Sequence, residues 1–65
     1  MSYQPQIGDI VRLSWGTQIN PSVKYIVCDV NLPPHAEILC VDLVKLKHHY
    51  FYWYEVELIV SGESP

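Results

Sequence analysis

HHYFYWYEVELIV, residues 48–60, decides the fold of this chain. Five consecutive aromatic residues precede a run of aliphatic ones, and both kinds of residue favour the pleated surface of a β-strand. Because successive side chains of a strand point to opposite faces of the sheet, the tyrosines of this run face one side and its other two rings face the other. The first set is Tyr50, Tyr52 and Tyr54, and the second is Phe51 and Trp53. The pattern does not decide which set is buried; if the second fills the core, the tyrosines form an exposed surface.

Three segments upstream also have the composition of strands. Residues 10–15 place Val11, Leu13 and Trp15 on one face, and residues 23–30 are rich in β-branched and aromatic side chains. Residues 36–44 predict a third strand, with a helix as the alternative because this segment also contains Ala, Glu and Leu.

Turns are expected between these strands. GTQINPS at residues 16–22 is a loop, and Pro33 and Pro34 end the second strand because proline cannot donate to a ladder. Residues 45–49 form a polar turn. Glu55 interrupts the last run, so a short 3₁₀ turn or sharp bend is expected there, followed by a final strand over residues 57–60.

Five short strands and no convincing helix predict an all-β chain. We expect a small five-stranded SH3-like barrel, since closing a sheet of this size hides its edges. Sixty-five residues make one domain. We expect this domain to span residues 7–60, after a flexible lead-in over residues 1–6 in which Tyr3 is a candidate packing anchor. Residues 61–65 form a polar tail.

The charge balance restricts the classes of partner. The net charge is -3 and only four residues are Lys or Arg, which disfavours nonspecific binding to nucleic acid. No apolar run approaches the roughly 20 residues of a membrane helix, and the first residues lack the regions of a signal peptide. We therefore expect a cytoplasmic protein without membrane contact, whose two cysteines are reduced thiols.

The two ends of the predicted domain are IGDIVRL, residues 7–13, and WYEVELIV, residues 53–60. They resemble the ends of small SH3-like barrel proteins of bacteriophages, which begin with a Gly-Asp-hydrophobic-Val-Arg stretch and close with a Trp and an alternating strand. The middle of the chain differs from that pattern at residues 24–27 and 47–49. The resemblance implies a viral accessory protein that acts on a host component in the host cytoplasm, and it transfers no catalytic residues.

The cysteines test the pairing of the second and third strands. If the loop centred on Pro34 closes these strands symmetrically, Cys28 and Cys40 lie directly opposite each other. We expect two small thiols packed side by side in the core, with a cross-strand disulfide as the alternative.

Metal binding and catalysis find little support. A zinc site needs four ligands, and the chain offers five candidates: the two cysteines, His35, His48 and His49. However, no Cys-x-x-Cys pair occurs, and adjacent histidines on a strand point to opposite faces. The chain has no nucleophile motif and no glycine-rich phosphate loop. We expect no metal, no cofactor and no catalytic residue.

The tyrosine surface, defined as Tyr50, Tyr52 and Tyr54, is the main candidate site. Tyrosine offers a large contact area with a polar tip and little rotamer entropy to lose. Pro33 and Pro34 are expected at its rim, together with the loop over residues 16–22. The partner is another protein or a second copy of the chain. In the alternative, the N-terminal arm and the tail cover the surface within one molecule.

Nucleic-acid binding is the second reading of the same region. Lys45, Lys47 and His48 lie directly before the tyrosines, and cations beside aromatic rings are the ingredients of a single-strand groove. Alternatively, the two lysines keep a hairpin tip soluble and discourage edge pairing.

Overall fold

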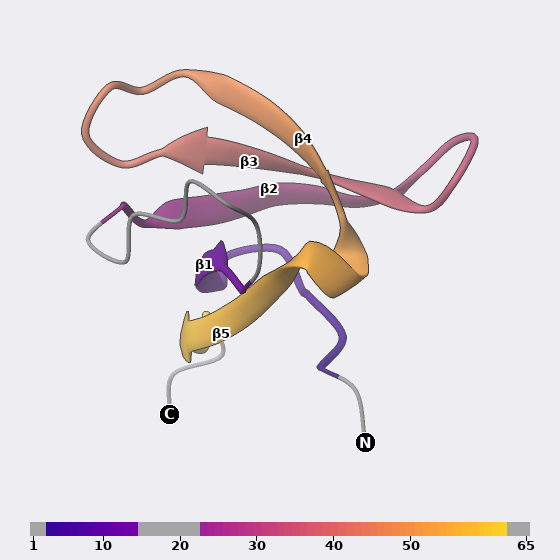
Figure 1. Ribbon diagram of the computed structural model, residues 1–65, viewed down its shortest axis with the longest axis horizontal. Coiled ribbons are helices and arrows are strands. Elements are labelled where there is room, and N and C mark those ends of the chain that lie inside the picture. Colours follow the sequence, from indigo (N-terminus) through magenta and orange to yellow (C-terminus); the bar gives the residue numbers. More distant parts are fainter. Residues whose placement is uncertain (1–2, 15–22, 63–65) are drawn as a thin grey trace.

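The computed structural model of the chain describes residues 3–14 and 23–62. These residues form one antiparallel sheet of five strands, with no α-helix among them (Figure 1). In chain order the elements are β1 (Ile10–Leu13), β2 (Tyr25–Leu32), β3 (Glu37–Asp42), β4 (His48–Tyr52), the 3₁₀ helix η1 (Trp53–Glu55) and β5 (Val56–Val60). The all-β prediction and the count of five strands are confirmed.

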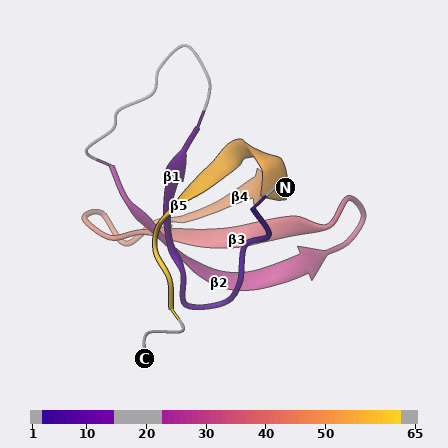
Figure 2. The same ribbon diagram turned by 90° about the horizontal axis from the view of Figure 1, so that it is seen from below.

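The strands lie in the order β4-β3-β2-β1-β5, so β4 and β5 are the two edges and the sheet is not closed. The chain meanders through neighbouring strands except between β4 and β5, where η1 carries it across to the far edge. β1 runs steeply across the direction of β3, which reflects strong twisting and coiling of the sheet (Figure 2).

Most predicted boundaries hold to within two residues. Residues 36–44 contain a strand and not a helix, and the 3₁₀ turn falls at η1, directly before β5. The second strand extends to Leu32, two residues further than expected, because Leu32 still pairs with Glu37. Trp15 and the predicted loop over residues 16–22 lie outside the described residues.

The core follows from the alternation of side chains along the strands. One face of β2 and β3 supplies four of its six buried apolar residues, and β1 and β5 supply one each. The six are Val11, Tyr25, Val27, Ile38, Cys40 and Val56. Phe51 and Trp53 are half-buried and pack against this cluster, as does Tyr3 from the N-terminal arm.

The predicted register of the two cysteines is wrong. Cys40 pairs with Val27, and the register then shifts so that Asp29 pairs with Leu39. Cys28 is the extra residue of this irregularity in β2, and such a bulge turns the following side chains by one position. As a result Cys40 is buried, Cys28 is exposed, and both are free thiols.

Asp9 ties both ends of the described chain to the sheet. Its buried carboxylate accepts hydrogen bonds from the hydroxyl of Tyr3, from the amide of Gln6 at 3.1 Å and from the amide of Gly62 at 2.9 Å. Gly62 lies directly against Gly8, because a Cβ on Gly62 would come within 2.5 Å of the Gly8 backbone. Gly8 itself has a φ of 96°, which residues with a side chain rarely adopt. Tyr3 therefore packs back on the domain, as the sequence suggested.

These hydrogen bonds determine the protonation of the pair. Burial by itself raises the pKa of Asp9, but the bonds from Gly62, Tyr3 and Gln6 outweigh it and hold the pKa below its ordinary value. Burial and the neighbouring Asp9 carboxylate raise the pKa of Tyr3. Asp9 is therefore charged and Tyr3 is neutral at pH 7.

Candidate functional site

β4 separates its aromatic side chains into two sets. Tyr50 is 64% exposed, Tyr52 36% and the following Tyr54 54%, whereas Phe51 is half-buried against the core. The Phe51 ring meets Tyr25 edge to face at 5.2 Å between centroids. The predicted alternation is confirmed along β4, with Tyr50 and Tyr52 outside and Phe51 inside. Trp53 and Tyr54 belong to η1 (Trp53–Glu55) and not to the strand, but Trp53 is half-buried and Tyr54 is exposed.

Tyr52 and Tyr54 form a parallel stack. Their ring centroids lie 5.4 Å apart with an interplanar angle of 2°, and Tyr54 also meets Trp53 edge-on at 5.5 Å. Tyr54 belongs to η1 and not to the strand, so this stack depends on the turn of the chain after Tyr52. The two rings present one continuous aromatic surface.

Glu55 and Ser14 hold η1 in place. The amide of Tyr52 donates to the Glu55 side chain at 2.7 Å, which caps the 3₁₀ turn. The amide and hydroxyl of Ser14 both donate to the Glu55 carbonyl, at 2.8 and 3.0 Å. The tyrosine stack is thereby fixed both to β4 and to the end of β1.

The turn between β2 and β3 lies beside the stack. Pro33 and Pro34 are exposed in this turn and are joined by a cis peptide bond. The ring of His35 meets Tyr52 at 6.2 Å with an interplanar angle of 61°. The β2–β3 turn and the end of β4 therefore lie at the same end of the sheet (Figure 1). Sequence reasoning considered His35 only as a metal ligand and missed this contact.

A pocket of about 210 Å³ lies at this same end. Trp53 forms one wall and links the pocket to the stack through its contact with Tyr54. The remaining lining comes from the N-terminal arm, the end of β2 and the start of β3: Gln4, Pro5, Val30, Asn31, Ala36 and Ile38. No local motif signals this pocket, because its walls come from four separate parts of the chain.

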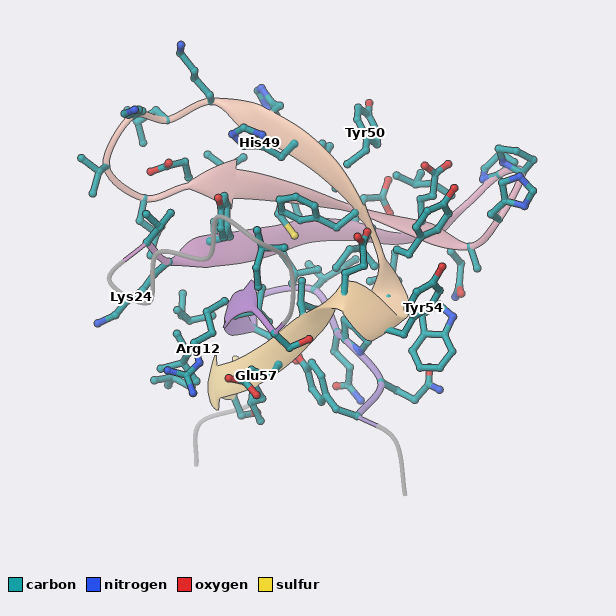
Figure 3. The ribbon with its side chains drawn as sticks, viewed as in Figure 1. Arg12, Lys24, His49, Tyr50, Tyr54 and Glu57 are labelled. Carbon is teal, nitrogen blue, oxygen red and sulfur yellow. The ribbon has the colours of Figure 1, made fainter. Side chains whose placement is uncertain are left out.

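Tyr50 lies apart from the pocket, on the outer face of the sheet. It points away from the molecule (Figure 3) and pairs across β3 and β4 with Leu39. Beside this pair, Val41 lies between Ile26 and His48. The middle of β3 is therefore apolar on both sides, and its outer side is only partly covered.

Lys45 and Lys47 lie on the exposed turn that joins β3 to β4. The Asp42 side chain accepts hydrogen bonds from the amides of Val44 and Lys45, at 2.7 and 3.0 Å, and these bonds lower its pKa. The turn is at the opposite end of β4 from Tyr52, about 16 Å away at about 3.3 Å per residue. His48 begins the strand on the same face as Tyr50.

The other basic residues contribute nothing to this surface. Arg12 is paired with Glu57 across β1 and β5, and Figure 3 shows this pair and Lys24 away from Tyr50 and Tyr54. Within residues 3–14 and 23–62, no three His, Cys, Asp or Glu side chains come together as a metal site. The same part of the chain contains no helix long and apolar enough to cross a membrane.

No protein-family model matches the chain, and no curated protein or solved structure matches it significantly.

Proposed function

We propose that this chain is a small, non-catalytic protein-binding module that binds a partner protein through the tyrosine surface, chiefly through its Tyr52–Tyr54 stack. The observation that carries the proposal is the exposed parallel stack of Tyr52 and Tyr54 beside a pocket walled by Trp53. Rings held rigidly before binding lose little entropy when a partner covers them. Pro33 and Pro34 form the rim of the contact.

The size of the pocket favours a protein partner over a cofactor. Small-molecule sites usually enclose about 300–1,000 Å³, and this pocket encloses about 210 Å³. That volume suits a single inserted side chain. We infer that one anchor residue of the partner enters against Trp53 while the chain around it lies on Tyr52 and Tyr54.

We further propose that the sheet is an SH3-like barrel whose closure is incomplete. The meandering strand order and the 3₁₀ turn before the last strand support this arrangement. The two segments that resemble phage barrel proteins fall on neighbouring elements, β1 and η1 with β5, joined by the bonds from Ser14 to Glu55. A viral accessory role that modulates a host protein, in the host cytoplasm, rests on that resemblance.

Affinity capture with matched baits tests the proposed function. The wild-type chain and the Tyr52→Ala/Tyr54→Ala variant are compared in nuclease-treated lysate, with Ile7→Ala as a control for the loss of an exposed apolar side chain. We expect one protein to be retained by wild type and control at equal levels and lost from the tyrosine variant. Equal retention by all three baits contradicts the proposal.

The alternative is a nucleic-acid-binding barrel that uses Lys45, Lys47 and His48 with the nearby tyrosines. The observation in its favour is that His48, Tyr50 and Tyr52 share one face of β4, directly after Lys47. Lys45→Glu/Lys47→Glu separates the two functions, because it abolishes nucleic-acid binding and leaves capture of a protein by the Tyr52–Tyr54 stack intact.

A further inference from the structure

β4 is an edge strand whose hydrogen-bonding direction follows from its register with β3. The amide of Asp42 donates to the carbonyl of Lys47 at 2.9 Å. Hydrogen-bonded pairs recur at every second position of an antiparallel ladder. The pairs Cys40–His49 and Ile38–Phe51 therefore bond across the ladder.

The intervening residues of β4 point their backbone groups the other way. The N–H and C=O groups of His48 and Tyr50 face the open edge, and no strand of the described sheet pairs with them there. At Tyr52 this free edge ends, because its amide is already bonded to Glu55. The edge thus offers two residues, each with one donor and one acceptor.

We propose that two copies of the chain pair through their β4 edges, antiparallel, about a two-fold axis at His49. In this register His48 of each copy lies opposite Tyr50 of the other, and each pair exchanges two hydrogen bonds. Four bonds then use all the free groups of both residues and none of the groups engaged by Glu55. A symmetric interface requires such self-complementarity.

The charges along the hairpin favour a second copy as the occupant. At one end the β3–β4 turn carries Lys45 and Lys47 against the single carboxylate of Asp42, which is bonded to the turn's own amides. The other end carries Glu37 on β3 and Glu55 in η1. Antiparallel pairing brings the basic end of each copy beside the acidic end of the other. The stretch from His48 to Tyr52 has no Lys, Asp or Glu, the residues that normally keep an exposed edge from pairing.

Pairing also covers the most exposed ring of the tyrosine surface. Tyr50 is 64% exposed beside the apolar outer face of β3, and the two-fold places it against His48 of the other copy. Tyr52 and Tyr54 lie outside the paired residues. The dimer is therefore independent of partner binding by the Tyr52–Tyr54 stack.

The oligomeric state of the full chain is the first test. Sedimentation equilibrium should show a mass that rises with concentration from 7.5 kDa to twice that value. Tyr50→Pro removes an amide that faces the open edge, so it spares the β3 ladder and should weaken the dimer about tenfold or more. Tyr50→Lys, which keeps the amide but charges the edge, should weaken it as well. A wild-type mass that stays at one chain up to about 1 mM overturns the proposal.

Cross-linking tests the register. Both native cysteines are replaced (Cys28→Ser, Cys40→Ala), and a cysteine is introduced by His49→Cys or, as the control, by His48→Cys. Residue 49 faces its own copy across the axis, within the about 4.4–6.8 Å between Cα atoms that a disulfide spans, whereas residue 48 does not. We expect rapid disulfide dimers for the first variant only.

The outcomes separate this dimer from other assemblies. A dimer that survives Tyr50→Pro and does not cross-link at position 49 refutes the β4 pairing and directs attention to the β5 edge. Tyr52→Ala/Tyr54→Ala should dimerise like wild type while losing the captured protein, so failure of either proposal is visible without the other.

Discussion

Asp9 is the residue whose charge matters most to the fold. Its carboxylate accepts from Tyr3, Gln6 and Gly62 in a site with almost no solvent contact. We expect Asp9→Asn to lower the free energy of unfolding at pH 7 by about 1–3 kcal/mol, because the amide nitrogen of asparagine cannot accept these bonds. Urea unfolding followed by tryptophan fluorescence measures the change. Asp29→Asn, at an exposed carboxylate, is the control and should change stability much less.

The Asp9→Asn variant also tests how the free energy of unfolding depends on pH. The pKa of Asp9 lies below its ordinary value in the folded state, and the unfolded value is about 3.9. The stabilising contribution of the Asp9 carboxylate is therefore present above about pH 4. It is lost as the pH falls through the folded-state pKa of Asp9. The difference between wild type and Asp9→Asn should shrink below about pH 4. The pKa of Asp42 is also lowered. Because Asp42 is present in both proteins, its effect on stability cancels in the difference between them. If the difference in stability between the two proteins does not change with pH, Asp9 is not the charged acceptor described above.

The two thiols should react very differently. Cys40 is fully buried, and burial raises its pKa to about 12, whereas Cys28 is exposed. Since the thiolate is the reactive form, a disulfide reagent should label one thiol quickly in the native protein and both in urea. Cys28→Ser should abolish the fast reaction. Fast labelling of two thiols without denaturant is incompatible with the observed register.

At the scale of elements, η1 should depend on the side chain of Glu55. This side chain caps the turn through the amide of Tyr52. We expect Glu55→Gln to retain most of the stability and Glu55→Ala to lose about 1 kcal/mol. The near-UV circular dichroism of the tyrosines should also change in Glu55→Ala, because the turn positions Tyr54 against Tyr52.

Glu57→Ala provides the matched control on β5. Glu57 pairs with Arg12 at an exposed position, and such ion pairs contribute about 0–1 kcal/mol. Its removal should leave the tyrosine signal unchanged. If both variants alter that signal equally, the turn is not what holds the stack.

The β3–β4 turn contains a residue in an unfavourable backbone conformation. Leu46 has a φ of 58° and is 71% exposed, so glycine at this position relieves strain and loses little buried surface. We expect Leu46→Gly to raise the free energy of unfolding by about 0.5–1 kcal/mol. Lys45→Gly, one residue earlier and without a positive φ, should lower it. Thermal unfolding of the two variants gives the comparison.

The periodicity of the side chains and the local composition were sufficient to predict the strands, the turns and the 3₁₀ helix. The aromatic run, the proline pair and the single Glu55 each determine a strand, a turn or a 3₁₀ helix by local rules, and these predictions are confirmed. The register of Cys28 and Cys40 failed because a bulge depends on how two strands fit and leaves no local pattern. Asp9 was not recognised as a buried hub for the same reason, since its donors come from both ends of the described chain.

At the scale of the whole molecule, the candidate site combines predictable and unpredictable parts. That Tyr50 and Tyr52 share one face follows from simple alternation along β4, whereas the exposure of that face is known only from the structure. The pocket beside Trp53 and the contact of His35 with Tyr52 arise only when four separate segments come together at one end of the sheet. An isolated hairpin containing the tyrosines therefore lacks the pocket.

The charge of the whole molecule leads to a last prediction, on nucleic acid. Only four residues are Lys or Arg against seven Asp or Glu. Arg12 is held by Glu57, and Glu37 lies opposite Tyr52, where a stacked base would bring its phosphate. Binding to single strands depends on neutralising phosphates. We expect no saturable binding of a labelled strand of about 12 nucleotides by fluorescence polarisation, even at about 50 mM salt.

Saturable binding of the labelled strand would contradict this prediction, and its dependence on salt would identify the cause. Binding that weakens steeply with salt and disappears in Lys45→Glu/Lys47→Glu would establish the basic turn as a phosphate site. It would then make the tyrosines a stacking platform for bases. Binding that ignores both salt and these lysines would instead point to the rings alone, since stacking on an aromatic face needs no counterion release. Protein capture that tolerates the lysine variant and fails in Tyr52→Ala/Tyr54→Ala is the combination that the geometry of the stack and pocket requires.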